Sequence, residues 1–208
     1  MIRLHHLNQS RSHRVLWLLE ELDLPYEIAF YERDPVTRLA PASLKAIHPL
    51  GKSPVITDGD VTVAESGAII DYLIDSYGQG RLRPERGTGE YVDYLQWLHF
   101  AEGSAMLPLM LGLYVGRLGE AGGPLWPRIF DEMQNHLGYM NEALAQKPFI
   151  AGDSLTGADI QLSFVAQSAR SANLLTDYPH IVAYVDRLVA RPAYIRALEK
   201  GGPVEFTR

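Results

Sequence analysis

The stretch 48–70, HPLGKSPVITDGDVTVAESGAII, constrains the fold more than any other part of the sequence. It reads as four elements in succession: a strand opened by Pro54, a turn at 58–59, a return strand over 60–63 and a helix that begins at Glu65. A proline that opens a strand cannot donate a ladder hydrogen bond, so Pro54 belongs at the rim of a sheet, often after a cis peptide bond. A cis bond at Ser53-Pro54 would turn the Ser53 amide and carbonyl towards solvent. An extended peptide could pair with them there.

The helix that begins at Glu65-Ser66 offers a second set of ligand groups. Its unpaired backbone N–H groups, the Ser66 hydroxyl and the positive end of the helix dipole suit a carboxylate. The Glu65 carboxylate suits an ammonium group. A ligand with an amino-acid end and a peptide middle therefore fits both halves of the stretch.

The hydrophobic pattern divides the chain into two halves. Strands over 2–7 and 26–31 flank a helix over 10–22, and a βαβ unit of this length has a right-handed crossover and parallel strands. With a short helix at 41–47 and the hairpin and helix of the opening stretch, this unit fills about 78 residues. The following residues are rich in Gly, Pro and Arg and read as a linker. Helices are expected beyond it at 90–115, 125–146, 158–174, 181–190 and 193–199.

The segment AGDSLTGADI predicts how one of these helices begins. Thr156 and Asp159 have the spacing of a capping box, and Leu155 and Ile160 have that of a hydrophobic staple. The helix that follows is small and apolar around most of its circumference, so we expect it to be the central buried helix of the second half.

Composition excludes several functions. A net charge of −6 argues against a nucleic-acid-binding surface, which needs clustered Lys and Arg. The chain has no cysteine, so any thiol chemistry must come from a bound thiol. Its seven histidines include no H-E-x-x-H pattern, and no metal is expected. No signal peptide is recognisable, and the apolar run 107–115 is shorter than a membrane helix, so we expect a cytoplasmic protein.

The loop NQSRSHR, which joins the first strand to the first helix, contains the candidate reactive groups. Ser10 and Ser12 lie at a helix N-terminus, where either hydroxyl is a possible N-cap. Alternatively, one of them donates a hydrogen bond to a bound thiolate. Both interpretations remain open from the sequence.

These motifs resemble those of the glutathione S-transferases. The resemblance rests on S-x-x-x-R from Ser10 to Arg14, on the pattern P-x-x-x-x-P-V-I from Pro49 to Ile56, which contains K-S-P-V, and on E-S after the hairpin. It covers essentially the whole chain, and the opening LNQSRSHRVLWLLEEL is similar to that of a bacterial and fungal branch with an active serine. The resemblance implies a thioredoxin-like domain over 1–78, a linker over 79–89 and an all-α domain over 90–208. It also implies a cytoplasmic homodimer active in detoxification.

The site residues that the resemblance implies fall into three groups. The catalytic group is Ser10, with Ser12 and Arg11 as runners-up. The glutathione contacts are Lys52, Ser53, Pro54, Glu65, Ser66 and, from across a dimer interface, Glu102. The hydrophobic co-substrate contacts are Leu107, Met110 and Tyr114.

The implied activity is attack by the glutathione thiolate on small hydrophobic electrophiles, with glutathione as co-substrate. Two alternatives remain: a transferase-like protein that binds ligands or docks a partner without turnover, and a glutathione-dependent peroxidase or disulfide reductase. The sequence does not identify the electrophile. His48 replaces the asparagine that often precedes the proline in this family, and it has no assigned role.

Overall fold

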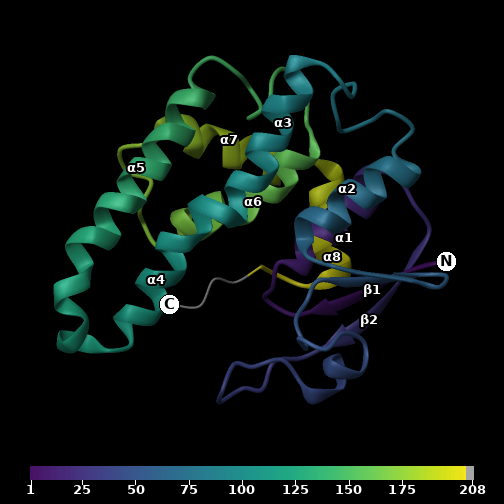
Figure 1. Ribbon diagram of the computed structural model, residues 1–208, viewed down its shortest axis with the longest axis horizontal. Coiled ribbons are helices and arrows are strands. Elements are labelled where there is room, and N and C mark those ends of the chain that lie inside the picture. The colour runs from purple at the N-terminus through teal and green to yellow at the C-terminus, as the bar shows by residue number, and fades with distance from the viewer. Residues whose placement is uncertain (205–208) are drawn as a thin grey trace. The chain divides into compact units, whose positions relative to one another are not determined.

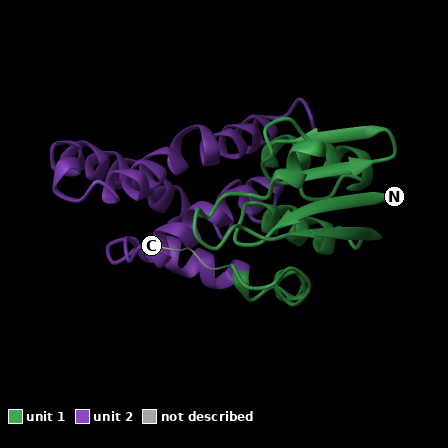
Figure 2. Cartoon of the chain, turned by 90° about the horizontal axis from the view of Figure 1, so that it is seen from below, with its two compact units in different colours: residues 1–82, 189–206 green, residues 83–188, 207–208 purple. Residues whose placement is uncertain are grey.

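The computed structural model describes residues 1–204 and divides the chain into two compact units (Figures 1 and 2). Unit 1 contains Met1–Leu82 and the segment that begins at Val189. Unit 2 is the stretch Arg83–Leu188. The described residues from Val189 onward thus belong with the N-terminal part of the chain, and the domain boundaries at 78 and 90 stay a prediction.

Unit 1 is built on a four-stranded mixed sheet. Its strands are β1 (Ile2–Leu7), β2 (Tyr26–Tyr31), β3 (Val55–Asp58) and β4 (Val61–Ala64), in the order β2-β1-β3-β4. β1 and β2 are parallel, as the βαβ pattern predicts, whereas β3 runs antiparallel to both β1 and β4. The helices are α1 (Ser12–Glu21), a 3-10 turn (Ala42–Ala46) and α2 (Ser66–Tyr77). α1 contacts β1 and α2, and α2 contacts β3 and β4.

The β3–β4 hairpin turns one residue later than predicted. Asp58 pairs with Val61, so the two loop residues are Gly59 and Asp60. Gly59 has a φ of 57°, and two-residue hairpin loops favour glycine where the first loop residue takes a positive φ. Gly59 therefore suits the first position of this two-residue loop, and the pairing of β3 with β4 sets the register.

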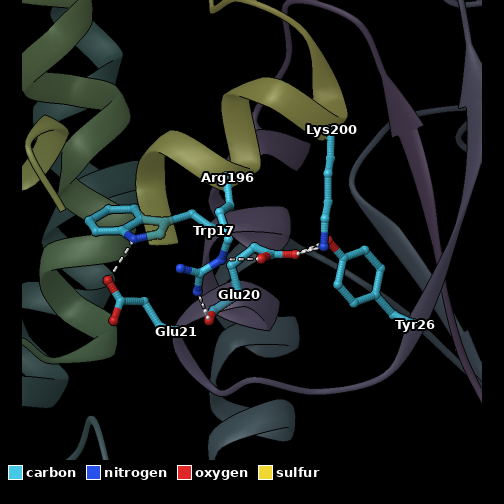
Figure 3. A network of polar contacts seen from close by, with 6 residues as sticks. All are labelled: Trp17, Glu20, Glu21, Tyr26, Arg196 and Lys200. Atoms are coloured by element: carbon cyan, nitrogen blue, oxygen red, sulfur yellow. Dashed lines mark hydrogen bonds and ion pairs between the residues drawn. The ribbon is translucent and has the colours of Figure 1, made fainter. Parts of the chain in front are cut away.

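α8 (Pro192–Gly201) completes unit 1 by packing on α1. The buried Trp17 ring meets the Tyr194 ring edge-on at 5.2 Å. Beside them the Glu20 carboxylate, 6% exposed, accepts hydrogen bonds from Arg196 Nε at 2.8 Å, from Lys200 Nζ at 2.5 Å and from the Tyr26 hydroxyl (Figure 3). A second pair joins Glu21 to Arg191 through two hydrogen bonds, at 2.6 and 3.0 Å. These contacts tie the last helix to the first.

Unit 2 is helical. Its elements are α3 (Gly89–Phe100), a π-helical turn η2 (Ala101–Ala105), α4 (Met106–Gly116), a 3-10 segment η3 (Gly119–Leu125), α5 (Trp126–Leu144), α6 (Gly157–Ser171) and α7 (Pro179–Val189). α6 contacts α3 and α4, and α5 contacts α4. The helices predicted for the second half are therefore present, with ends shifted by a few residues.

The stretch Gly89–Gly116 runs through η2 without leaving helical conformation. At the end of this π turn the Met106 amide reaches the Ala101 carbonyl, five residues earlier. Pro108, two residues later, has no amide hydrogen to donate to the preceding turn. By length and composition alone this stretch is apolar enough to cross a membrane. Within unit 2 this stretch packs on α5 and α6.

The start of α6 has the predicted capping box. Asp159 accepts hydrogen bonds from the Thr156 amide and hydroxyl, each at 2.8 Å, and from the Ile150 amide at 2.8 Å. The Tyr184 hydroxyl of α7 donates to the same carboxylate at 2.9 Å. Asp159 is fully buried, so this one side chain links the start of α6 to the preceding loop and to α7.

Candidate functional site

The first part of the site lies at the end of the β1–β3 ladder, just before β3 begins. The last pair in this ladder is His5 with Val55, because Pro54 has no N–H to continue it. The Ser53 side chain takes over this role: its hydroxyl donates to the His5 carbonyl at 2.8 Å and accepts from the Leu7 amide at 3.3 Å. The Ser53-Pro54 bond is cis, as predicted. Ser53 is half-buried and Pro54 is buried.

The second part of the site gathers around the Leu7 carbonyl, one residue before the β1–α1 loop. Ser10 Oγ donates to this carbonyl at 2.7 Å, and Ser12 Oγ lies 3.2 Å from the same oxygen. The two hydroxyl oxygens are 2.7 Å apart, and Ser10 Oγ also accepts from the Ser12 amide at 3.2 Å. Ser10 is 5% exposed and Ser12 is 0% exposed. Ser10 therefore satisfies the first backbone amide of α1. The N-cap position itself is occupied by Arg11, whose side chain makes no capping hydrogen bond, so the interpretation of either serine as the N-cap was wrong.

His6 joins this pair of serines, a contact that the sequence analysis missed. Its Nδ1 lies 2.9 Å from Ser12 Oγ, and its Nε2 lies 2.9 Å from the Gly201 carbonyl at the end of α8. Burial lowers the pKa of His6, and the hydrogen bond to Gly201 opposes this shift. His6 is therefore a neutral imidazole at neutral pH.

The third part of the site is the start of α2. Glu65 precedes the helix with a φ of 71° and is exposed, whereas Ser66 is buried. Arg14 of α1, 1% exposed, donates from Nη1 to Ser66 Oγ at 3.3 Å. The sequence analysis used Arg14 only as a spacing landmark. The structure shows that it connects the beginnings of the two helices.

Arg33 anchors the β1–α1 loop, which was a further omission. Its amide donates to Asn8 Oδ1 at 2.9 Å, and its guanidinium donates to the Asn8 and Gln9 carbonyls at 3.2 and 3.3 Å. Gln9 has a φ of 50°, so this loop carries a left-handed residue directly before Ser10. A distant arginine in a loop gives no sequence pattern that would predict these bonds.

Two further candidates border the site residues in sequence. Arg11, at the N-terminal boundary of α1, is half-buried, and Lys52, next to Ser53, is exposed. The structure thus brings together the three predicted segments of unit 1. Ser53 and the two serines meet at Leu7, and Arg14 links α1 to Ser66.

The remaining predicted residues lie in unit 2. Glu102 is half-buried in η2, Met110 is half-buried, and Leu107 and Tyr114 are each 56% exposed. Leu107 lines a cavity of about 390 Å³ between α4 and α5, to which Leu111 and Ile129 also contribute. Arg128 and Glu132, which form an ion pair, make part of its wall polar.

Comparison with known proteins identifies this arrangement. Residues 1–75 match the family model "Glutathione S-transferase, N-terminal domain", and residues 123–192 match "Glutathione S-transferase, C-terminal domain". Glutathione S-transferase 3 of Schizosaccharomyces pombe is 35% identical over 215 residues, which cover 96% of this chain and 88% of the yeast protein. The chain belongs to the glutathione S-transferase family. The predicted enzyme class is therefore confirmed.

Two solved glutathione S-transferase structures extend the comparison. A crystal structure of the protein from Actinobacillus pleuropneumoniae is 38% identical, with a TM-score of 0.89. The match covers 99% of this chain and 95% of the Actinobacillus chain. A family member from Pseudomonas fluorescens, solved with two glutathione molecules bound, is 28% identical, with a TM-score of 0.80. The match covers 95% of this chain and 92% of the Pseudomonas chain. The predicted architecture, a thioredoxin-like N-terminal fold followed by a helical C-terminal region, is confirmed. Within residues 1–204 no group of three His, Asp or Glu side chains is placed to hold a metal ion.

Proposed function

We propose that this transferase binds glutathione at the edge of its sheet and activates the thiol as a thiolate for attack on small hydrophobic electrophiles. One observation carries the proposal: the loop before α1, the Ser53-Pro54 segment and the start of α2 are joined through Leu7 and Arg14. These are the segments that a tripeptide with an amino-acid end requires. The glutathione bound to the related Pseudomonas fluorescens protein supports the choice of ligand.

Each part of glutathione has a proposed partner. The cysteinyl amide and carbonyl pair with the Ser53 backbone beside Pro54. The γ-glutamyl carboxylate binds at Ser66 and the α2 N-terminus, where the N–H groups of the first turn and the helix dipole favour an anion, and its amine faces Glu65. The exposed Lys52 side chain reaches the glycyl carboxylate.

Ser10 is the proposed catalytic residue. A thiol of pKa about 8.5 must be lowered by about two units to ionise at neutral pH, which requires about 2.7 kcal/mol. A hydrogen bond to the charged sulfur contributes about 1.5–3 kcal/mol and a helix N-terminus about 0.3–1 kcal/mol. Ser12 lies deeper than Ser10, and Arg11 has no hydroxyl, so we place both behind Ser10.

The electrophile site and the assembly are further parts of the proposal. Leu107, Met110 and Tyr114 offer apolar surface on one helix, and two of them are more than half exposed. We propose that they contact a small hydrophobic co-substrate. We also propose that the protein is a cytoplasmic homodimer that detoxifies electrophiles, in which Glu102 contacts the glutathione amine of the partner subunit. Sedimentation of the whole chain tests the dimer.

The test begins with glutathione binding by calorimetry and an ultraviolet titration of the bound thiolate. We expect binding with a lowered thiol pKa, and turnover with aryl halides, epoxides or unsaturated aldehydes. Ser10→Ala should raise the bound thiol pKa and reduce turnover by about tenfold. Binding without a lowered thiol pKa would instead indicate a binding protein without turnover. Activity confined to hydroperoxides or disulfides would indicate a peroxidase or reductase.

A further inference from the structure

A continuous chain of hydrogen bonds runs from Ser10 into the interior of unit 1. Ser10 Oγ lies 2.7 Å from Ser12 Oγ, and Ser12 Oγ lies 2.9 Å from His6 Nδ1. His6 Nε2 lies 2.9 Å from the Gly201 carbonyl. Every member of the chain is buried or is a backbone carbonyl, so solvent does not compete for these bonds.

The carbonyl at the inner end fixes the direction of the chain. A carbonyl oxygen only accepts, so His6 Nε2 carries the hydrogen and the neutral ring has an accepting Nδ1. Ser12 must then donate to Nδ1, and a remaining lone pair of its oxygen faces the Ser10 hydroxyl. In this state the Ser10 hydrogen points inward, to Ser12 or to the Leu7 carbonyl. Ser10 thus presents a lone pair to a ligand, whereas stabilising a thiolate requires a hydrogen.

We propose that His6 accepts the thiol proton of glutathione through Ser10 and Ser12, an inference that rests on the proposed function. The S–H bond breaks and its proton passes to Ser10 Oγ, while the Ser10 proton passes to Ser12 and the Ser12 proton to His6 Nδ1. The products are a thiolate and an imidazolium, and no other reactant is consumed. Each hydroxyl now points outward, so Ser10 donates to the thiolate that it helped to form.

The surroundings of His6 suit this role. An imidazolium donates from both nitrogens, and both acceptors, Ser12 Oγ and the Gly201 carbonyl, are already in place. The Phe30 ring meets the imidazole edge-on at 5.8 Å. Burial lowers the pKa of His6 and so disfavours an isolated charge there, while the hydrogen bond to the Gly201 carbonyl acts in the opposite direction. The proton therefore stays on His6 only while the thiolate balances it.

His13 is the other buried imidazole of this region and serves as a matched control. Its ring packs against Tyr194 at 5.0 Å, and among the described residues its Nε2 has no hydrogen-bond partner. Burial, with a smaller contribution from His6, lowers the pKa of His13 to about 3. The series of hydrogen bonds that starts at Ser10 does not include His13.

The deciding experiment locates the proton by ¹⁵N NMR of the His6 ring in the whole protein. We expect the neutral Nε2–H tautomer in the protein alone and with S-methylglutathione, which has no thiol proton. With glutathione we expect His6 to be protonated on both nitrogens. A neutral His6 beside an ionised glutathione thiol would overturn the inference and leave the proposed function standing. Failure of the protein to bind or ionise glutathione would overturn both.

Variants separate proton transfer from simple positioning. Ser12→Ala and His6→Gln should raise the bound thiol pKa and lower kcat by about tenfold. Their Kd for S-methylglutathione should stay within about twofold of the wild-type value, because that ligand has no thiol proton to pass to His6. Ser12→Thr keeps the hydroxyl and should restore the thiol pKa, and His13→Gln should leave it unchanged. Equal loss of affinity for both ligands, with an unchanged thiol pKa, would show a merely structural role and contradict the inference.

Discussion

Arg14 Nη1 donates to the Ser66 hydroxyl at 3.3 Å and thereby connects two helix N-termini that are 52 residues apart in the chain. The guanidinium is almost completely buried, so its loss affects both the fold and the proposed glutathione site. We expect Arg14→Lys to lower the free energy of unfolding by about 2–4 kcal/mol, because an ammonium cannot reproduce the geometry of a buried guanidinium. We also expect weaker glutathione binding.

Urea denaturation and calorimetry measure these two effects. Arg3→Lys is the matched control, because the Arg3–Glu27 pair is half exposed and contributes less than about 1 kcal/mol. A stability loss at Arg14 no larger than that at Arg3 would contradict the bridging role.

The Glu20 cluster predicts how stability depends on pH. Burial raises the pKa of Glu20, but hydrogen bonds from Lys200, Tyr26 and Arg196 together outweigh it and hold the pKa below its ordinary value of 4.5. A lowered folded-state pKa contributes stability above the unfolded value, and this contribution is lost as pH falls through the folded value. Glu20→Gln should therefore be less stable than the wild type at pH 7, by about 1–3 kcal/mol, since Arg196 and Lys200 are partly solvated.

Denaturation experiments at pH values from about 7 to below 4.5 measure the difference in unfolding free energy between the wild type and Glu20→Gln. The gap between wild type and Glu20→Gln should narrow as the pH falls. Glu27→Gln, which removes an exposed carboxylate, should show a much smaller difference at every pH. A constant gap for Glu20→Gln across the range would disagree with this account.

Asp159 gives a prediction for unit 2. Its carboxylate accepts four hydrogen bonds while fully buried, and burial raises the pKa of Asp159 although those bonds act in the opposite direction. Asp159→Asn replaces one accepting carboxylate oxygen with an amide NH₂ group, which donates. This buried NH₂ group then faces a partner that also donates. We expect a loss of about 2–4 kcal/mol in unfolding free energy. Asp153→Asn, at an exposed position of the same loop, should change stability by less than about 0.5 kcal/mol; similar losses for both variants would refute the prediction.

Glu65 predicts opposite effects on stability and on binding. A left-handed residue other than glycine carries backbone strain, and Glu65 has a φ of 71°. Glu65→Gly should raise the unfolding free energy by about 0.5–1 kcal/mol. The substitution relieves the backbone strain, and the greater conformational entropy of glycine in the unfolded chain offsets part of this gain. Glutathione affinity should fall, because the proposed amine contact is lost.

Gln79→Gly provides the comparison, since Gln79 is also left-handed and is exposed away from the proposed ligand contacts. It should gain similar stability with unchanged glutathione affinity. If Glu65→Gly retained full affinity, the assigned contact with the glutathione amine would have to be abandoned.

Local patterns in the sequence predicted most of the fold. The bounds of β1 and β2 and the capping box of α6 agree with the structure because propensity, periodicity and capping act over a few neighbouring residues. The hairpin turn was misplaced by one residue, since Asp58-Gly59 and Gly59-Asp60 are both acceptable turn pairs and only strand pairing chooses between them.

The site was predictable only in part, for a related physical reason. Motif spacing indicated Ser10, Ser53 and Ser66, which lie at element ends with recognisable sequence patterns. His6 and Arg33 act through contacts with residues far away in the chain, and no local period encodes such contacts. The packing of α8 on α1 is non-local in the same way, although its helical pattern was clear.

The packing of α8 on α1 also sets an order of events during synthesis. The ribosome produces β1 and α1 well before Arg191, Arg196 and Lys200, which neutralise Glu20 and Glu21 from positions 170 to 180 residues further along the chain. Until then the nascent N-terminal unit carries an uncovered Trp17 and uncompensated carboxylates. A stop codon that removed α8 would consequently harm a part of unit 1 that is made much earlier, namely α1.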